Sequence, residues 1–254
     1  MAYQKNIYRS SLMKKIFLIL FLLLPSLLFA VETIQSYKPV YFLAGDNENQ
    51  VKYQVSFKYA LCYPFETGLF FAYTQVAHWN LYDRSSPFKE TNYNPSIFWE
   101  IENVNQWLDF ARVIPYEHKS NGRDGQDSRG IDRYFGEMQI SYGQTFNIGL
   151  REKAGGYYAI SNHNKDIKRY IGYFETEAFA QIKDKHGYIG HEKIYIKGEW
   201  THKYYWYECG LSIRLFTEKI QPDIYIQYYR GYGEFLLDYN KKTEALRAGF
   251  IFSN

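Results

Sequence analysis

Alternation of apolar and polar residues is the dominant pattern along this chain. In the segment Val51-Lys-Tyr-Gln-Val-Ser-Phe-Lys-Tyr59 every second residue is apolar, and polar residues stand between them. Because successive side chains of a β-strand point to opposite faces, the pattern predicts a strand with one apolar and one polar face. Weaker versions recur at residues 192–200, 210–216, 223–229 and 245–252. Gly, Asn, Asp and Pro clusters separate such segments, which predicts roughly ten to twelve strands in one domain.

Composition narrows the class of β-protein. Aromatic residues make up 20% of the 254 residues, with 27 tyrosines, whereas the mean hydropathy is negative. Girdles of aromatic residues, together with strands that are apolar on one face and polar on the other, are typical of an outer-membrane β-barrel. A secreted β-sandwich is the alternative. The net charge of +3 is small and no basic stripe is present, so we expect no nucleic-acid partner.

The first 30 residues have the pattern of a secretory signal peptide. A basic pair precedes a short apolar run, which a proline interrupts and which ends at the small residue Ala30. About fifteen apolar residues are short for a membrane-spanning helix. We therefore expect cleavage after Ala30, with Met13 as an alternative start, and a mature domain over residues 31–254.

The two cysteines are expected to be free thiols. An exported protein could in principle join Cys62 and Cys209 in a disulfide. Alternation, however, places Cys62 on the polar face of its strand, and Cys209 on the face of Leu211 and Ile213.

Candidate chemistry lies at the end of the strand predicted over residues 108–120. Its largely apolar face consists of Leu108, Phe110, Ile114 and Tyr116, interrupted by Arg112. His118 and Ser120 continue this face, so we expect both on the outside of the barrel, at the edge of the lipid band. A serine beside a histidine base is the core of nucleophilic acyl transfer.

A carboxylate is predicted to join this pair. On the next strand, the outer face consists of Asp132, Tyr134, Gly136, Met138 and Ile140. Two neighbouring antiparallel strands would bring Asp132 to His118, where an acidic group could orient and stabilise the imidazolium. The alternative is that Asp132 is a solvated carboxylate at the edge of a loop.

Gln75 is a polar residue on a predicted lipid-facing side. By alternation it lies on the same face as the apolar residues Leu69, Phe71, Tyr73 and Trp79. An amide in hydrocarbon costs several kcal/mol unless it is hydrogen-bonded, which indicates contact with another protein surface. With the faces reversed, Gln75 would be an ordinary lumen residue.

Several motifs together resemble one family. They are Tyr73-Thr-Gln75, Ser85-Ser-Pro-Phe-Lys-Glu-Thr-Asn-Tyr93-Asn-Pro, His118-Lys-Ser120-Asn-Gly122-Arg123, Ser128-Arg-Gly-Ile-Asp132-Arg133 and Gly231-Tyr-Gly-Glu-Phe-Leu-Leu-Asp-Tyr-Asn240. The chain resembles the outer-membrane phospholipase A family of Gram-negative bacteria over essentially its whole mature length. The resemblance implies a 12-stranded transmembrane barrel that hydrolyses acyl esters of phospholipids and lysophospholipids, with calcium and as a homodimer.

The resemblance also implies roles for individual residues. Ser120 would be the nucleophile and His118 the general base, and the Gly122 N–H would help to bind the oxyanion. The family commonly has Asn where this chain has Asp132, which restores a Ser-His-Asp set.

A calcium site is implied in the same way. The Arg123 carbonyl, the Ser128 hydroxyl and the Ser85 carbonyl of a second subunit would hold the ion, and all three are neutral oxygens. Gln75 matches a dimer-interface glutamine. Tyr93 and Trp79 would line the groove for the acyl chain, with an aromatic-girdle role as the alternative.

Two other functions remain open from the sequence. One is a barrel enzyme that deacylates lipid A, which also uses an external Ser/His pair. The other is a porin-like barrel without enzymatic activity, in which His118 and Ser120 are incidental. The Ser-Asn-Gly-Arg run and the Ser-Ser-Pro-Phe segment favour phospholipids.

Overall fold

The structure, a computed structural model, describes residues 34–46, 51–61, 67–182, 192–201, 203–214 and 222–252. Two compact units divide the chain, Met1–Gln35 and Ser36–Asn254. The described part of the first unit is the short strand β1 (Ile34–Gln35). The expected signal peptide therefore lies outside the described residues.

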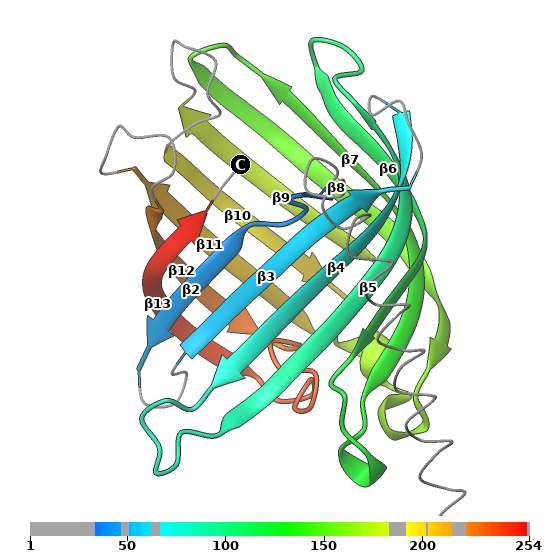
Figure 1. Cartoon of the computed structure of the whole chain (residues 1–254), viewed down its shortest axis with the longest axis vertical. Helices are drawn as coiled ribbons and strands as arrows, with labels where there is room; N and C mark the ends of the chain where they lie inside the picture. The colour runs from blue at the N-terminus through cyan, green and yellow to red at the C-terminus, as the bar shows by residue number, and fades with distance from the viewer. Residues whose placement is uncertain are drawn as a thin grey trace, which may run out of the picture. The chain divides into compact units, whose positions relative to one another are not determined.

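The second unit is a closed antiparallel barrel of twelve strands, β2 to β13 (Figure 1). The strands are β2 (Val40–Gly45), β3 (Val51–Ala60), β4 (Thr67–Trp79), β5 (Phe88–Glu102), β6 (Leu108–Ser120), β7 (Gly130–Tyr142), β8 (Phe146–Ile160), β9 (Phe174–Ile182), β10 (Glu192–Trp200), β11 (Tyr205–Ile213), β12 (Asp223–Gly231) and β13 (Thr243–Phe252). Neighbours in sequence pair antiparallel, and the pairing of β13 with β2 closes the barrel. The predicted fold is confirmed. Among the described residues, no helix is both long and apolar enough to cross a membrane.

Along most strands, polar side chains point into the barrel and apolar side chains point outward. On β3, Lys52, Ser56 and Lys58 are buried, whereas Val55 is 48% exposed. Large apolar side chains are exposed in the same way on most of the other strands. An exposed apolar wall around a polar interior is what a lipid environment requires.

Charged side chains fill the interior as ion pairs. Glu117 on β6 is fully buried and its Oε1 accepts a hydrogen bond of 2.5 Å from Nε of Arg133 on β7. Lys58 and Glu100 form a further buried pair. Since a buried charge is costly without a partner, this network constrains how the strands associate.

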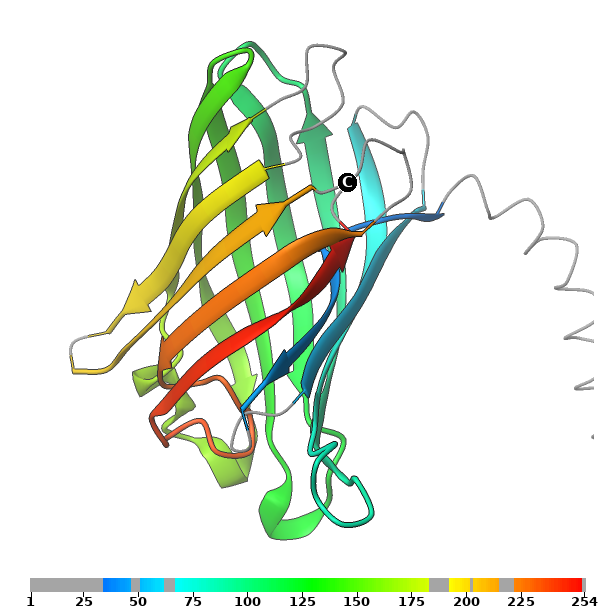
Figure 2. The same ribbon diagram turned by 90° about the vertical axis from the view of Figure 1, so that its left-hand side faces the viewer.

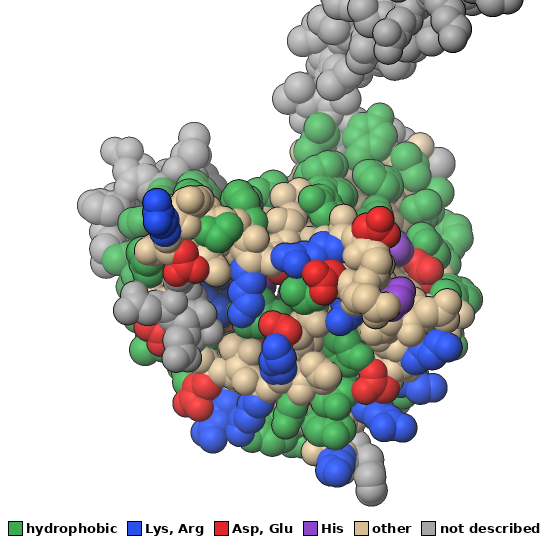
Figure 3. Space-filling model, turned by 90° about the horizontal axis from the view of Figure 1, so that it is seen from below, with side chains coloured by type: hydrophobic (Ala, Val, Ile, Leu, Met, Phe, Trp, Pro, Cys, Tyr) green, Lys and Arg blue, Asp and Glu red, His purple; other side chains and the backbone are tan. Residues whose placement is uncertain are grey.

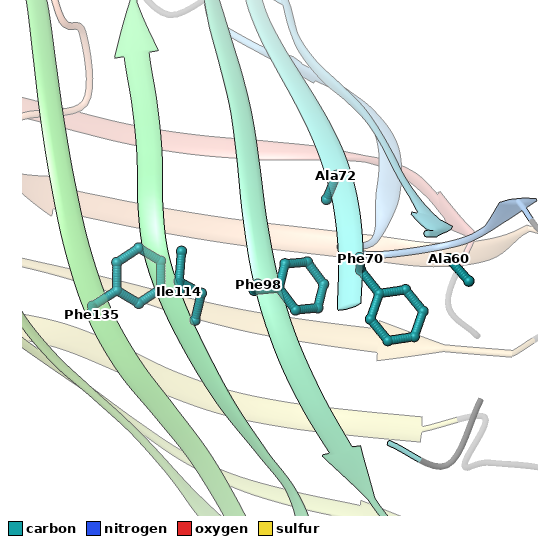
Figure 4. Packing of buried hydrophobic residues seen from close by; sticks show 6 residues of the cluster. All are labelled: Ala60, Phe70, Ala72, Phe98, Ile114 and Phe135. Atoms are coloured by element: carbon teal, nitrogen blue, oxygen red, sulfur yellow. The ribbon is translucent and has the colours of Figure 1, made fainter. Parts of the chain in front are cut away.

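The first half of β6 faces the other way from the prediction, because the strand contains a β-bulge. Phe110 and Ile114, predicted to lie outside, are buried in the lumen; Ile114 packs between Phe98 and Phe135 (Figure 4). The pairing of β6 with β7 shifts by one residue between Ile114 and Glu117. Because one inserted residue reverses the alternation, the two halves of the strand turn opposite faces to the lumen.

After the bulge, the side chains in the second half of β6 face the side that was predicted for them. Val113 is 61% exposed before the bulge, and Tyr116 is exposed after it. Arg112, which interrupted the apolar pattern, lies inside and pairs with Glu137 at 3.2 Å. His118 and Ser120 have the alternation of Tyr116 and therefore belong to the outer face.

One cysteine can be placed. Cys209 is free and half-buried on β11, between inward-facing Glu208 and Gly210, so it lies on the outer face with Leu211 as predicted. Cys62 lies outside the described residues, and its state stays a prediction.

The loops β4–β5, β6–β7 and β12–β13 lie at one end of the barrel (Figure 2). Seen from that end, charged side chains of both signs gather near the middle, and hydrophobic side chains lie along much of the edge (Figure 3). The β12–β13 loop is held there by Glu90 on β5, whose carboxylate accepts hydrogen bonds of 2.7 and 2.8 Å from the N–H groups of Leu236 and Leu237. Glu90 therefore fixes the β12–β13 loop at the end of the barrel where β6 presents His118 and Ser120.

Candidate active site

The end of β6 and the start of β7 bring His118 and Asp132 together. The two residues are direct cross-strand partners, and Ser120 pairs with Gly130 in the same ladder. His118 Nδ1 and Asp132 Oδ1 are 2.7 Å apart. About a third of each side chain is exposed on the outer wall. A carboxylate at Nδ1 fixes the imidazole and leaves Nε2 as the proton acceptor.

Ser120 lies two residues beyond His118 on the same face and is half-buried. Its cross-strand partner on β5 is Tyr93. Among the hydrogen bonds of the described residues, none joins the Ser120 hydroxyl to His118. Hydrogen bonds between a nucleophile and its base commonly tighten only with substrate, so the shared face is the relevant observation.

Asn121 organises the loop that follows Ser120. Its side-chain Oδ1 accepts hydrogen bonds from the N–H of Arg123 at 3.3 Å and of Arg129 at 3.0 Å. Its Nδ2 donates to the Asp127 carbonyl at 2.8 Å. Asn is suited to such local bonds because its short amide reaches its own backbone. The motif around Ser120 contains Asn121, but no role was predicted for it, although an Asn before a Gly in a loop is a recognisable turn signal.

Gly122 is required by both its conformation and its surroundings. Its φ of 62° lies in the left-handed region. A Cβ at this position would lie 2.7 Å from the ring of Tyr93. The tight turn places the Gly122 backbone N–H next to the end of β6, two residues after Ser120.

The residues predicted to hold calcium lie on two loops. Arg123 and Ser128 flank the short 3-10 helix η1 (Gly125–Asp127), and Ser85 lies on the β4–β5 loop with a φ of 71°. Within the described ranges, no group of three or more His, Cys, Asp or Glu side chains could hold a metal ion. The expected donors are neutral carbonyl and hydroxyl oxygens instead, which suit a hard cation.

The loop also carries two exposed carboxylates. Asp124 accepts a hydrogen bond of 2.6 Å from the Gly125 N–H, and Asp127 lies 3.7 Å from the Arg123 guanidinium. Their negative charge favours a cation nearby. The neutral oxygens of the expected donors and the carboxylates beside them thus fit a calcium site.

Gln75 lies on the outer wall, as predicted. Thr74 is buried and hydrogen-bonds Ser56 inside the barrel at 2.8 Å, so its neighbour Gln75 faces outward. Its cross-strand partners are Val55 and Tyr93, both exposed. The alternative that Gln75 faces the lumen is wrong. Its Oε1 accepts a hydrogen bond of 3.0 Å from the Tyr73 hydroxyl.

Trp79 at the end of β4 and Tyr93 on β5 were predicted to line a groove for the acyl chain, and that role stays a prediction. Trp79 stacks on Phe88 with ring centroids 5.5 Å apart, and its Nε1 donates to the Ser86 carbonyl at 2.8 Å. These contacts fix the β4–β5 loop beside Ser85.

Sequence comparison decides the family. The phospholipase A1 family model matches residues 23–252. The chain belongs to the phospholipase A1 family. Among its relatives, phospholipase A1 of Escherichia coli is 30% identical over 232 residues, covering 82% of this chain and 72% of the relative. Phospholipase A1 of Salmonella typhimurium is 29% identical over 231 residues, with the same two coverages, 82% and 72%.

Solved structures agree with this family assignment. Outer membrane phospholipase A from Escherichia coli superposes with a TM-score of 0.72 at 25% identity, covering 87% of this chain and 92% of that one. A Salmonella typhi outer membrane phospholipase dimer with bound calcium has the same TM-score of 0.72 and 25% identity, with coverages of 87% and 93%. The family resemblance and the outer-membrane barrel are therefore confirmed for this phospholipase A1 family member.

Proposed function

We propose that this family member is a calcium-dependent outer-membrane phospholipase, active as a homodimer, that hydrolyses acyl esters of glycerophospholipids and lysophospholipids. The proposed activity includes both phospholipase A1 and phospholipase A2 cleavage. The observation that carries the proposal is the 2.7 Å contact between His118 and Asp132 beside Ser120, on the wall that faces lipid. A substrate in the surrounding membrane reaches a site on that wall without entering the barrel.

The reaction follows from the order of these groups. Ser120 Oγ attacks the ester carbonyl carbon while His118 Nε2 takes its proton, and Asp132 stabilises the imidazolium. The imidazolium then protonates the departing glycerol oxygen, which leaves an acyl group on Ser120. His118 next deprotonates a water that attacks this acyl-enzyme, and the fatty acid departs as Ser120 regains its proton. The Gly122 N–H stabilises the oxyanion at both steps.

Calcium would be held by the Arg123 carbonyl, the Ser128 hydroxyl and the Ser85 carbonyl of the partner subunit. It supplies positive charge for the developing oxyanion. Support comes from a related dimer that binds calcium and from the neutral oxygens on the two loops. With ligands from two subunits, the ion's affinity would depend on dimerisation, for which Gln75 on the outer wall provides a polar contact.

The proposed domain boundaries complete this picture. Residues 1–30 would direct export and be removed, leaving residues 31–254 as the membrane-inserted domain. The N-terminal sequence of protein purified from outer membranes tests this, and a start at Val31 is expected. The family match favours phospholipids over lipid A as substrate and gives no support to a porin-like function.

Fatty-acid release from mixed micelles tests the function. Purified protein should release fatty acid with calcium and lose most of this activity with chelator, and chemical cross-linking should yield a dimer only with calcium. Full activity from a calcium-insensitive monomer would refute the calcium and dimer parts of the proposal.

A further inference from the structure

Asp132 has a second hydrogen-bond donor besides the imidazole. The Tyr116 hydroxyl donates to Asp132 Oδ1 at 2.9 Å, and His118 Nδ1 lies 2.7 Å from the same oxygen. Tyr116 lies two residues before His118 on the outer face of β6, directly after the bulge. One carboxylate oxygen is therefore held between two side chains of the same strand.

A carboxylate on the outer wall needs this support. Ionised groups are expensive near lipid and persist there when they are paired. The imidazole can donate one hydrogen bond through Nδ1, and a phenol adds a second. Tyrosine suits this place because its ring is apolar and its hydroxyl is polar, as residues at a membrane edge commonly are.

The second donor also restricts how Asp132 can rotate. With Tyr116 and His118 both bonded to Oδ1, turning the carboxylate away from the imidazole breaks two hydrogen bonds at once. Hydrogen bonds to a charged acceptor are roughly twice as strong as those between neutral groups. Tyr116 therefore matters more with Asp at position 132 than it would with the neutral Asn that is common in the family.

We propose that Tyr116 is a positioning residue that holds Asp132 in the orientation that fixes the His118 imidazole. This inference rests on the proposed Ser120–His118–Asp132 mechanism. It does not give Tyr116 a contact with substrate, so its removal should lower kcat and leave KM nearly unchanged.

The first test is Tyr116→Phe, which removes the hydroxyl and keeps the ring. We expect kcat on micellar phospholipid to fall about tenfold, the loss expected for one charge-assisted hydrogen bond. The matched control is Tyr134→Phe, since Tyr134 is an exposed tyrosine on the same wall whose ring packs on Tyr158. Its kcat should stay within about twofold of the parent. Unchanged kcat in Tyr116→Phe, or a rise in KM alone, would overturn the proposal.

A double-mutant cycle with Asp132→Asn tests the mechanism of the effect. In that background, Tyr116→Phe should reduce kcat by at most about threefold, because the bond it removes is neutral. Equal fold-losses in both backgrounds would mean that Tyr116 does not act through Asp132. Ser120→Ala in the same assay separates the two claims: if it retains activity, the catalytic mechanism fails, whatever Tyr116 does.

Discussion

The Asn94 side chain on β5 donates a hydrogen bond of 2.6 Å from Nδ2 to the backbone carbonyl of His118 on β6. Asn94 points into the barrel, opposite to the face that carries the His118 imidazole. It precedes Pro95, which has no N–H to offer the neighbouring strands. A lumen side chain thus holds the backbone of the proposed catalytic base in place from the side opposite to its imidazole.

Asn94→Ala should lower kcat about three- to tenfold, because the partly buried His118 carbonyl would lose its side-chain donor and the end of β6 would be held less firmly. Steady-state hydrolysis of micellar phospholipid measures this. Ser96→Ala is the matched control, since Ser96 is buried on the same face of β5. If both variants lose activity equally, the loss comes from disturbed packing in the lumen, and the hydrogen bond from Asn94 to His118 is unimportant.

Asp132→Asn should retain substantial activity, within about tenfold of the parent, because an amide oxygen can still accept from His118 Nδ1 and orient the ring. What it loses is the charge that stabilises the imidazolium. Initial rates of fatty-acid release check this. A loss as large as that of Ser120→Ala would show that the carboxylate charge itself is indispensable.

Gly122→Ala should abolish most activity, with kcat reduced about a hundredfold or more, the size of effect seen when one oxyanion donor is displaced. The residue has a φ of 62° and a new Cβ would lie 2.7 Å from the Tyr93 ring, so the turn must shift. Gly125→Ala is a control for backbone strain, because Gly125 also has a positive φ but open space around it. Similar losses in both would attribute the effect to loop strain alone.

Glu117→Ala should destabilise the barrel by about 3 kcal/mol, since the half-buried Arg133 guanidinium would lose its fully buried carboxylate partner. Reversible urea unfolding in detergent or lipid measures the free energy of unfolding. The exposed pair Arg230–Glu244 provides the comparison: Glu244→Ala should lower the free energy of unfolding much less, because solvent screens an exposed pair. Equal costs would mean that the lumen pairs contribute no more than surface pairs.

The alternation along the chain predicted the barrel and much of its site. It placed Gln75 and Asp132 on the outer wall because β4 and β7 keep one alternation through those positions. It also paired His118 with Asp132, since a loop of nine residues joins two antiparallel strands that end level with each other.

The bulge in β6 could not be predicted in the same way. Phe110 and Ile114 are apolar on either face of a barrel, so their identity does not reveal that the alternation reverses before Glu117. Among these residues, Arg112 alone indicated that this half of the strand faces the lumen, because a charged side chain is not expected in the lipid band. Tyr116 and Asn94 were missed for a different reason: their roles are hydrogen bonds to atoms of other residues, and hydrogen-bond partners across strands depend on a register that the sequence does not specify.

The most direct test of the central claim is fatty-acid release by Ser120→Ala, measured with calcium on protein that folds and dimerises like the parent. If Ser120 is the nucleophile on the outer wall, the variant should lose at least about a thousandfold in kcat, because no acyl-enzyme can form. Retention of full activity by this variant would contradict the account.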